Sequence, residues 1–146
     1  MTVTFFGHRD CPEAIQLQLQ QVLEDLITDG ADSFYVGDQG RFDGMVISLL
    51  SKLKTAYPHI EYAAVLAYLP GTVKAEAVAP KHPTIFPEGL ENVPPRFAIS
   101  HRNRWMIDAS DCVVAYVTRS WGGAAQFTEL AEKKGKRVIR MEHSYL

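Results

Sequence analysis

Short apolar runs alternate with longer amphipathic stretches along most of the chain. Residues 2–6 (TVTFF) and 33–36 (SFYV) are mostly β-branched or aromatic, as is typical of buried strands. Between them, residues 13–28 place apolar side chains on one face at helical spacing, and Gly30 suits the end of that helix. The pattern therefore predicts a strand, a helix and a second strand.

The alternation continues toward the end of the sequence. Asp43 is predicted as the N-cap of a helix that ends near Ala56, and another helix is predicted from about Ala98 to Ala109. A further helix is predicted over GGAAQFTELAEKKG, residues 122–135. The remaining apolar runs predict three more strands, at residues 60–69, 112–117 and 136–141.

These strands lack strict polar alternation, which favours a parallel sheet covered on both faces. Right-handed crossovers then predict an α/β fold, a Rossmann-like, doubly wound, mainly parallel five-stranded sheet with helices on both faces. A length of 146 residues and a hydrophobic content of 47% fit a single domain, residues 1–146, with one packed core.

Residues 70–97 interrupt this pattern with six of the eight prolines. We interpret them as a proline-rich insertion, because so long a loop is usually a lid, an interface or a mobile segment. It is not a plain linker, since it also carries Ile85, Phe86, Leu90 and Phe97, which need a surface to pack on. A rigid apolar segment is a candidate interface, so we expect a homodimer.

Composition argues against several classes of function. The net charge of −2, with both signs mixed along the chain, argues against a duplex-DNA or membrane-surface binder, so neither nucleic acid nor a membrane is expected as a partner. No leader and no apolar run of about 18 residues is present, so we expect a cytoplasmic protein. Cys11 and Cys112 lack metal-ligand spacing. We expect two free thiols, with Cys112 buried, and neither a metal nor a cofactor.

Polar, glycine-rich loops leave three of the predicted strands at their carboxyl ends, where ligands bind to open parallel sheets. The loops read GHRD, GDQGR and TRSWGG, and each precedes a helix whose N-terminal N–H groups attract anions. Neither a P-loop motif nor G-x-G-x-x-G is present. The predicted ligand-binding residues are Gly7, His8, Arg9, Gly37, Asp38, Gly40, Arg104, Trp121, Gly122, Gly123, Ala124 and Gln126.

Four segments, FFGHR, VGDQGRFD, RFAISHRNRWMIDASD and WGGAAQFTELA, together resemble the SLOG superfamily, and most closely its YpsA-like branch. That superfamily also includes the Smf DNA-processing proteins and the lonely-guy phosphoribohydrolases. The resemblance covers most of the chain outside residues 70–90. It implies a Rossmann-like fold that binds a nucleotide or a nucleotide-derived signal.

The phosphoribohydrolases of this superfamily carry G-G-x-G-T-x-x-E, which Gly122, Gly123 and Glu129 match. Alanine and glutamine stand here in place of the third glycine and the threonine. Arg102 lies at the spacing of an arginine that these enzymes use on an N-glycosidic bond. If the chain is an enzyme, the resemblance implies Arg102 and Glu129 as its catalytic residues.

Three interpretations stay open at this point. The first is a binder of a nucleotide or nucleotide-derived phosphate ligand at the carboxyl ends of the strands. The second is a glycosidase that cleaves the N-glycosidic bond of a nucleoside monophosphate. The third is a protein-interaction module that uses residues 70–97 beside a vestigial pocket. The incomplete motif favours the first over the second, and three polar loops at one edge favour the first over the third.

Overall fold

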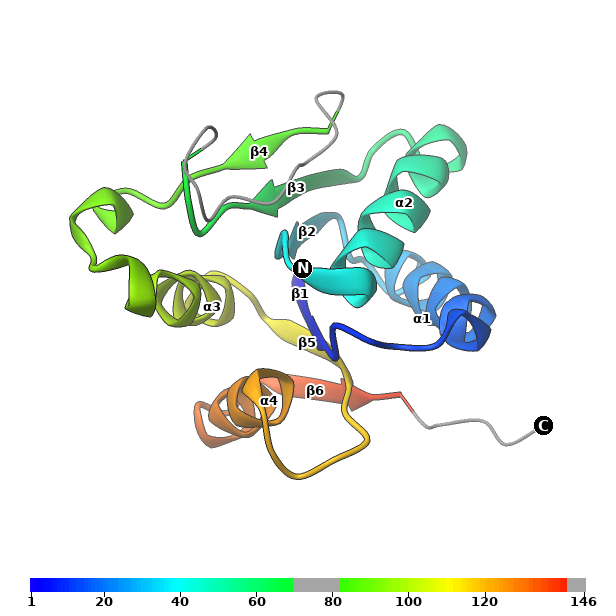
Figure 1. Ribbon diagram of the computed structural model, residues 1–146. Helices are drawn as coiled ribbons and strands as arrows, with labels where there is room; N and C mark the ends of the chain where they lie inside the picture. Colours follow the sequence, from blue (N-terminus) through cyan, green and yellow to red (C-terminus); the bar gives the residue numbers. More distant parts are fainter. Residues whose placement is uncertain (70–81, 142–146) are drawn as a thin grey trace.

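A six-stranded sheet, all of whose strand pairs are parallel, forms the centre of the computed structural model, which describes residues 1–69 and 82–141 (Figure 1). The strand order is β4-β3-β2-β1-β5-β6. This confirms the predicted Rossmann-like α/β class. The strands are β1 (Thr2–Gly7), β2 (Ser33–Val36), β3 (Glu61–Val65), β4 (Thr84–Ile85), β5 (Cys112–Tyr116) and β6 (Arg137–Arg140).

The prediction of five strands was one short, because β4 lies inside the segment read as a proline-rich loop. β4 holds only two residues, too few to leave a pattern in the sequence. It joins the sheet beside β3, where the N–H of Ala64 donates to the carbonyl of Pro83 and the N–H of Leu66 to that of Ile85. The strand predicted over residues 60–69 is also shorter in the structure, where β3 spans Glu61–Val65.

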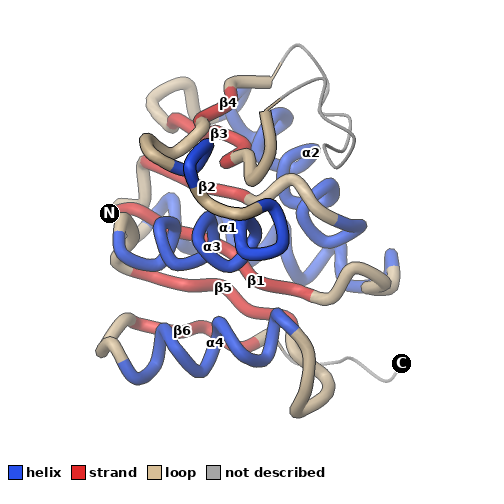
Figure 2. The backbone as a smooth tube through the Cα atoms, turned by 60° about the vertical axis from the view of Figure 1, so that its left-hand side comes forward, coloured by secondary structure: helices blue, strands red, loops and turns tan. Residues whose placement is uncertain are grey.

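Helices cover both faces of the sheet (Figure 2). The helices α1 (Gln16–Thr28) and α2 (Gly40–Ala56) pack on one face, and α3 (Ala98–Asp108) and α4 (Gly123–Lys133) pack on the other. Alternation along β1 explains this, since Phe5 faces the first pair of helices and Phe6 the second. Three short 3₁₀ turns complete the described elements: η1 (Glu13–Ile15), η2 (Leu90–Asn92) and η3 (Pro95–Phe97).

Asp43 was predicted as the N-cap of a helix, and that assignment is wrong. α2 begins earlier, at Gly40, and its N-cap is Gln39. Asp43 lies buried in the first turn instead. Its carboxylate has turned toward the start of the helix, which gives it a different role, described below. Cys11 and Cys112 are both free and both buried.

The second half of the proline-rich segment is anchored to the domain. Leu90 is buried in a small apolar cluster with Ala67 and Ala98, and Phe86 packs against that cluster. Residues 70–81 of the segment lie outside the described residues. The homodimer that we expected from this segment stays a prediction. None of the helices in residues 1–69 and 82–141 combines the length and apolar character that crossing a bilayer demands.

β1 marks the point where the order of the strands reverses. The chain moves from β1 to β2, β3 and β4 on one side, and later returns to place β5 and β6 on the other side. Such a reversal leaves a crevice at the carboxyl ends of the two central strands, because their following loops turn to opposite faces. The loops after β1 and β5 therefore meet at this edge.

Candidate functional site

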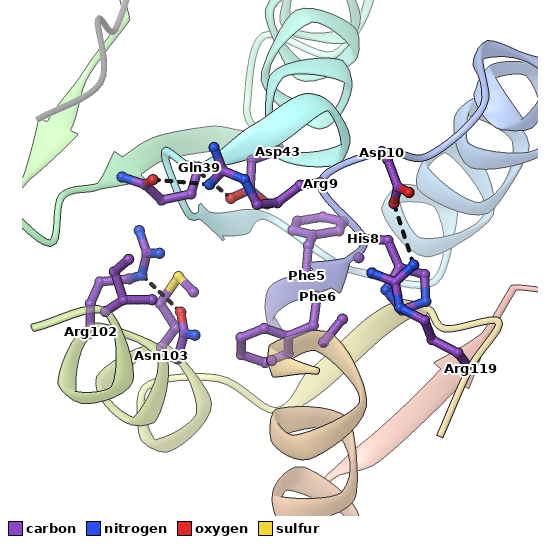
Figure 3. Close-up of a pocket in the computed structure, with 15 residues that line it drawn as sticks. Phe5, Phe6, His8, Arg9, Asp10, Gln39, Asp43, Arg102, Asn103 and Arg119 are labelled. Atoms are coloured by element: carbon purple, nitrogen blue, oxygen red, sulfur yellow. Dashed lines mark hydrogen bonds and ion pairs between the residues drawn. The ribbon is translucent and has the colours of Figure 1, made fainter. Parts of the chain in front are cut away.

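A cavity of about 320 Å³ lies at this edge, enclosed by the end of β1 and by α2, α3 and α4 (Figure 3). That volume is at the lower end of the range found for small-molecule sites. Its wall combines apolar side chains with charged groups. The lining residues are Phe5, Phe6, Gly7, His8, Arg9, Asp10, Gln39, Asp43, Ile99, Arg102, Asn103, Met106, Arg119, Gly123 and Ala124.

The N-terminus of α4 opens onto the cavity through Gly123 and Ala124. No side chain of the described residues caps this helix, which leaves the N–H groups of its first turn available to a ligand. The N-cap Gly122 has φ +94° and ψ 174°, a conformation open in practice only to glycine. A glycine at this position therefore lets the chain turn sharply from the loop into α4, so that the positive end of the helix dipole points toward the cavity.

Two arginines add positive charge beside this helix end. Arg9 donates from Nη1 to Gln39 Oε1 at 3.1 Å. Arg119 forms a loose ion pair with Asp10, with 3.6 Å between Nη1 and Oδ1, and its guanidinium lies 4.4 Å from the ring centroid of Trp121. Arg119 Nε is buried without a hydrogen-bond partner in the described part of the chain. The two side chains reach the cavity from different loops (Figure 3).

Arg102 is the centre of a buried polar cluster behind the cavity wall. Its Nη1 donates to Asp38 Oδ1 and to the carbonyl of Val65, each at 2.8 Å. Its Nε donates to Asn103 Oδ1, also at 2.8 Å. Only 2% of the residue is exposed. These bonds make Arg102 a brace between α3, the end of β3 and the loop after β2.

Asp43 completes this wall from the first turn of α2. Its Oδ2 accepts a hydrogen bond from the N–H of Gln39 at 3.1 Å, as carboxylates in capping boxes do. A methyl group added to Gly37 would lie 2.6 Å from that oxygen and 3.1 Å from Arg102 Cζ, so carboxylate and guanidinium both border Gly37. Burial raises the pKa of Asp43 to about 6, although the charge of Arg102 opposes the shift.

His8 joins the loop after β1 to the loop after β5. Its Nε2 accepts a hydrogen bond from the N–H of Thr118 at 2.9 Å, which places the proton of the neutral ring on Nδ1. Burial, followed by the charge of Arg119, lowers the pKa of His8 below its ordinary value of 6.5. Protonation would bring two donors together. The stabilising link is therefore present above pH 6.5 and is lost as the pH falls through the lowered pKa.

The structure brings five of the twelve predicted ligand-binding residues into the cavity wall. These are Gly7, His8, Arg9, Gly123 and Ala124, together with Arg102 from the predicted catalytic pair. Trp121 lies beside the cavity with 67% of its surface exposed, stacked on Arg119. The remaining predicted residues, Gly37, Asp38, Gly40, Arg104, Gly122 and Gln126, do not line the cavity.

Some of these glycines have a steric reason for their presence. A methyl group on Gly7 would overlap the ring of Phe42. One on Gly40, whose φ is +88°, would lie 2.8 Å from Arg9 Cα. Gly123 differs, because a methyl group there meets no heavy atom within 4 Å in the described chain. Gly7 and Gly40 thus allow close packing, whereas Gly123 borders open space at the cavity.

Glu129 lies in a second, more open cavity of about 350 Å³, with Thr118, Ser120 and Arg140 among its lining residues. Arg119 borders both cavities, but Arg102 borders only the first. The structure therefore does not bring Arg102 and Glu129 into one cavity. Within the described ranges, no three His, Cys, Asp or Glu side chains gather closely enough to hold a metal ion.

Sequence reasoning left out several residues of the cavity wall. Gln39, Asp43, Asn103 and Arg119 all contribute polar groups, but none was among the predicted ligand-binding residues. Arg119 stood in a glycine-containing loop at a strand end, which was a usable signal. Asn103 gave none, since a polar residue beside an arginine in a helix is usually solvated.

No protein-family model matches the chain, and no curated protein matches its sequence. Among solved structures, DNA processing protein A (DprA) from Streptococcus pneumoniae matches 99% of this chain with a TM-score of 0.73, at 16% sequence identity. The chain has a DprA-like fold. DprA from Helicobacter pylori also matches, over 99% of this chain, with a TM-score of 0.65 and 15% identity. The chain spans 51% of the first DprA and 66% of the second.

These neighbours are the Smf DNA-processing proteins of the SLOG superfamily, to which the sequence motifs pointed. The YpsA-like branch stays a prediction. The exclusion of nucleic acid as a partner was wrong, because the H. pylori DprA, which has this fold, binds single-stranded DNA. The exclusion used the charge of the whole chain, −2, and that sum hides three arginines that line one cavity.

Proposed function

We propose that the cavity binds a nucleotide, with its phosphate at the N-terminus of α4. The N–H groups of Gly123 and Ala124, which no side chain of the described residues caps, supply the anion site. The observation that carries the proposal is that these N–H groups lie at a cavity that Arg9 and Arg119 also line. The apolar part of the wall, with Phe6, suits a base or a ribose.

Gly123→Val tests this proposal. Because a Cβ at Gly123 meets no protein atom within 4 Å, valine fits the fold but projects into the space where the phosphate would lie. We expect calorimetric titration with a nucleoside monophosphate to show at least about tenfold weaker binding by the variant, because a close contact of backbone and phosphate is blocked.

Gly44→Val is the matched control. Gly44 lies exposed in α2, and a Cβ there also meets nothing within 4 Å. This variant should bind as the unmodified protein does. Equal affinity of the folded Gly123→Val and Gly44→Val variants would overturn the proposed phosphate position.

Single-stranded DNA is the second candidate ligand, and it would place one of its nucleotides in the same cavity. The DNA-binding DprA of H. pylori has this fold, and Trp121 presents an exposed ring next to the cavity, stacked on Arg119. Exposed aromatic rings beside basic grooves stack successive bases of single strands. This candidate therefore predicts that contacts continue beyond the cavity.

Trp121→Ala separates the two candidates. If DNA is the ligand, an oligo-dT should bind more tightly than dTMP. Trp121→Ala should then weaken binding of the oligonucleotide about tenfold and leave binding of dTMP unchanged. Fluorescence anisotropy with a labelled oligonucleotide measures the first, and calorimetry the second. Equal affinity for dTMP and the oligonucleotide would leave the free nucleotide as the ligand.

A further inference from the structure

Asn103 presents a buried hydrogen-bond donor to the cavity. It lies in the middle of α3, lines the cavity and has only 8% of its surface exposed. Arg102 Nε can only donate, so the amide atom 2.8 Å from it must be the oxygen, Oδ1. The amide nitrogen, Nδ2, is therefore the other end of the group. It has no hydrogen-bond partner among the described residues.

The orientation of this amide is held by the arginine behind it. Arg102 is itself fixed through Nη1, which donates to Asp38 and to the carbonyl of Val65. Rotating the Asn103 amide would bring two donors together and break the bond to Arg102 Nε. A free asparagine can either donate or accept at a given point. Here the fixed amide presents Nδ2 as its unpaired end, and a ligand that supplies an acceptor satisfies a group that is costly to leave unpaired.

We propose that Asn103 selects the base of the bound nucleotide by donating from Nδ2 to a carbonyl oxygen of that base. The cavity then favours bases that carry an oxygen at purine C6 or pyrimidine C4, such as hypoxanthine, guanine and uracil, over adenine and cytosine, which carry an amino group at that position. Asparagine ordinarily recognises adenine with both amide atoms, as donor to N7 and acceptor from N6. Here Arg102 Nε already uses one of the two lone pairs of Oδ1 and fixes the amide, so Nδ2 is the end of the amide that lacks a partner among the described residues.

This selection rests on the proposed function, in which the phosphate lies at α4. Asn103 and Arg119 lie on opposite sides of Phe6 in Figure 3. A nucleotide with its phosphate near Arg119 and α4 can therefore extend along Phe6 toward Asn103. The base then lies between the apolar wall and the fixed donor.

Inosine and adenosine monophosphates test the inference, because they share ribose and phosphate and differ at the edge of the base. Calorimetric titration of the unmodified protein should give roughly tenfold tighter binding of inosine monophosphate, the scale of one matched base contact. Uridine and cytidine monophosphates form a second pair, of which uridine monophosphate should bind more tightly.

Asn103→Asp changes the donor into an acceptor at nearly constant shape. One carboxylate oxygen can still accept from Arg102 Nε, while the other replaces Nδ2. We expect the preference for inosine monophosphate to disappear or reverse. Asn92→Asp, an exposed position in η2, makes the same chemical change away from the cavity and should leave the preference intact.

Ribose 5-phosphate, which has no base, separates the inference from the proposed function. If this probe and both purine nucleotides bind, but inosine and adenosine monophosphates bind equally, base selection is overturned and the phosphate site stands. If none of them binds, the proposed function fails, and the inference fails with it. If Asn103→Asp weakens ribose 5-phosphate as much as inosine monophosphate, Asn103 holds the phosphate and base selection is wrong. Should that variant not fold, the preference of the unmodified protein still decides.

Discussion

The carboxyl group of Asp43 is expected to contribute to the dependence of stability on pH. Its folded-state pKa of about 6 exceeds the ordinary value of 3.8, so the folded protein holds this proton more tightly than the unfolded chain does. The resulting stabilisation is complete below pH 3.8 and is lost as the pH rises through 6. Asp43→Asn keeps an oxygen for the N–H of Gln39 but cannot ionise.

We therefore compare the free energies of unfolding of Asp43→Asn and the unmodified protein as the pH rises from 4 to 7. The difference should shift in favour of the variant by on the order of 2 kcal/mol, since each pKa unit corresponds to about 1.4 kcal/mol. Urea unfolding at several pH values measures this difference. His8 titrates in both proteins, so its opposite effect cancels. Glu88→Gln, at an exposed position, is the control. Parallel pH profiles of Asp43→Asn and the unmodified protein would contradict the assignment of a raised pKa to this group.

At the scale of an element, the two adjacent glycines at the start of α4 have different roles. Gly122 needs its positive φ of +94°, whereas Gly123 is an ordinary helical position. Gly122→Ala should therefore lower the free energy of unfolding by about 1–3 kcal/mol, the cost of a strained backbone. Gly123→Ala should leave it unchanged or raise it by up to about 1 kcal/mol, because alanine favours the helix. Denaturant unfolding of both variants compares them directly, and equal effects would disprove the distinction.

Most helices and strands could be predicted from the sequence, but the residues of the cavity wall could be predicted only in part. Apolar periodicity predicts the four long helices and five strands, because burial on two faces of a sheet leaves a strong pattern. β4 escapes, because two residues carry no period. The loops at the strand ends predict Arg9 and Gly123 at the cavity, since topology alone brings those ends together. Asn103 depends on a side-chain bond to Arg102, and side-chain bonds between neighbours in a helix leave no pattern in the sequence.

At the scale of the whole molecule, the separation of Arg102 from Glu129 argues against hydrolysis. The two residues border different cavities, and Arg102 is committed to its bonds with Asp38 and Val65. Catalysis is sensitive to misplacement of about 1 Å, so two groups that border different cavities are poorly placed to act on one bond. We expect no release of free base or ribose 5-phosphate when the protein is incubated with adenosine monophosphate. Chromatography of the products measures this, and base release that Glu129→Gln abolishes would reverse the conclusion.

Two walls of the cavity, the end of β1 with its loop and the start of α4, come from segments that lie far apart in the sequence. Thr118 pairs with His8 across 110 positions, and Phe6 stacks on Phe127. During synthesis the cavity therefore cannot form until β5 and α4 have left the ribosome. A ligand that needs both walls adds RT ln(1 + [L]/Kd) to the stability of finished chains alone, about 2.7 kcal/mol at a hundred times Kd. Fragments that lack β5 and α4 gain no such stability. A higher concentration of ligand should therefore slow the proteolysis of chains that contain both walls and leave the proteolysis of such fragments unchanged.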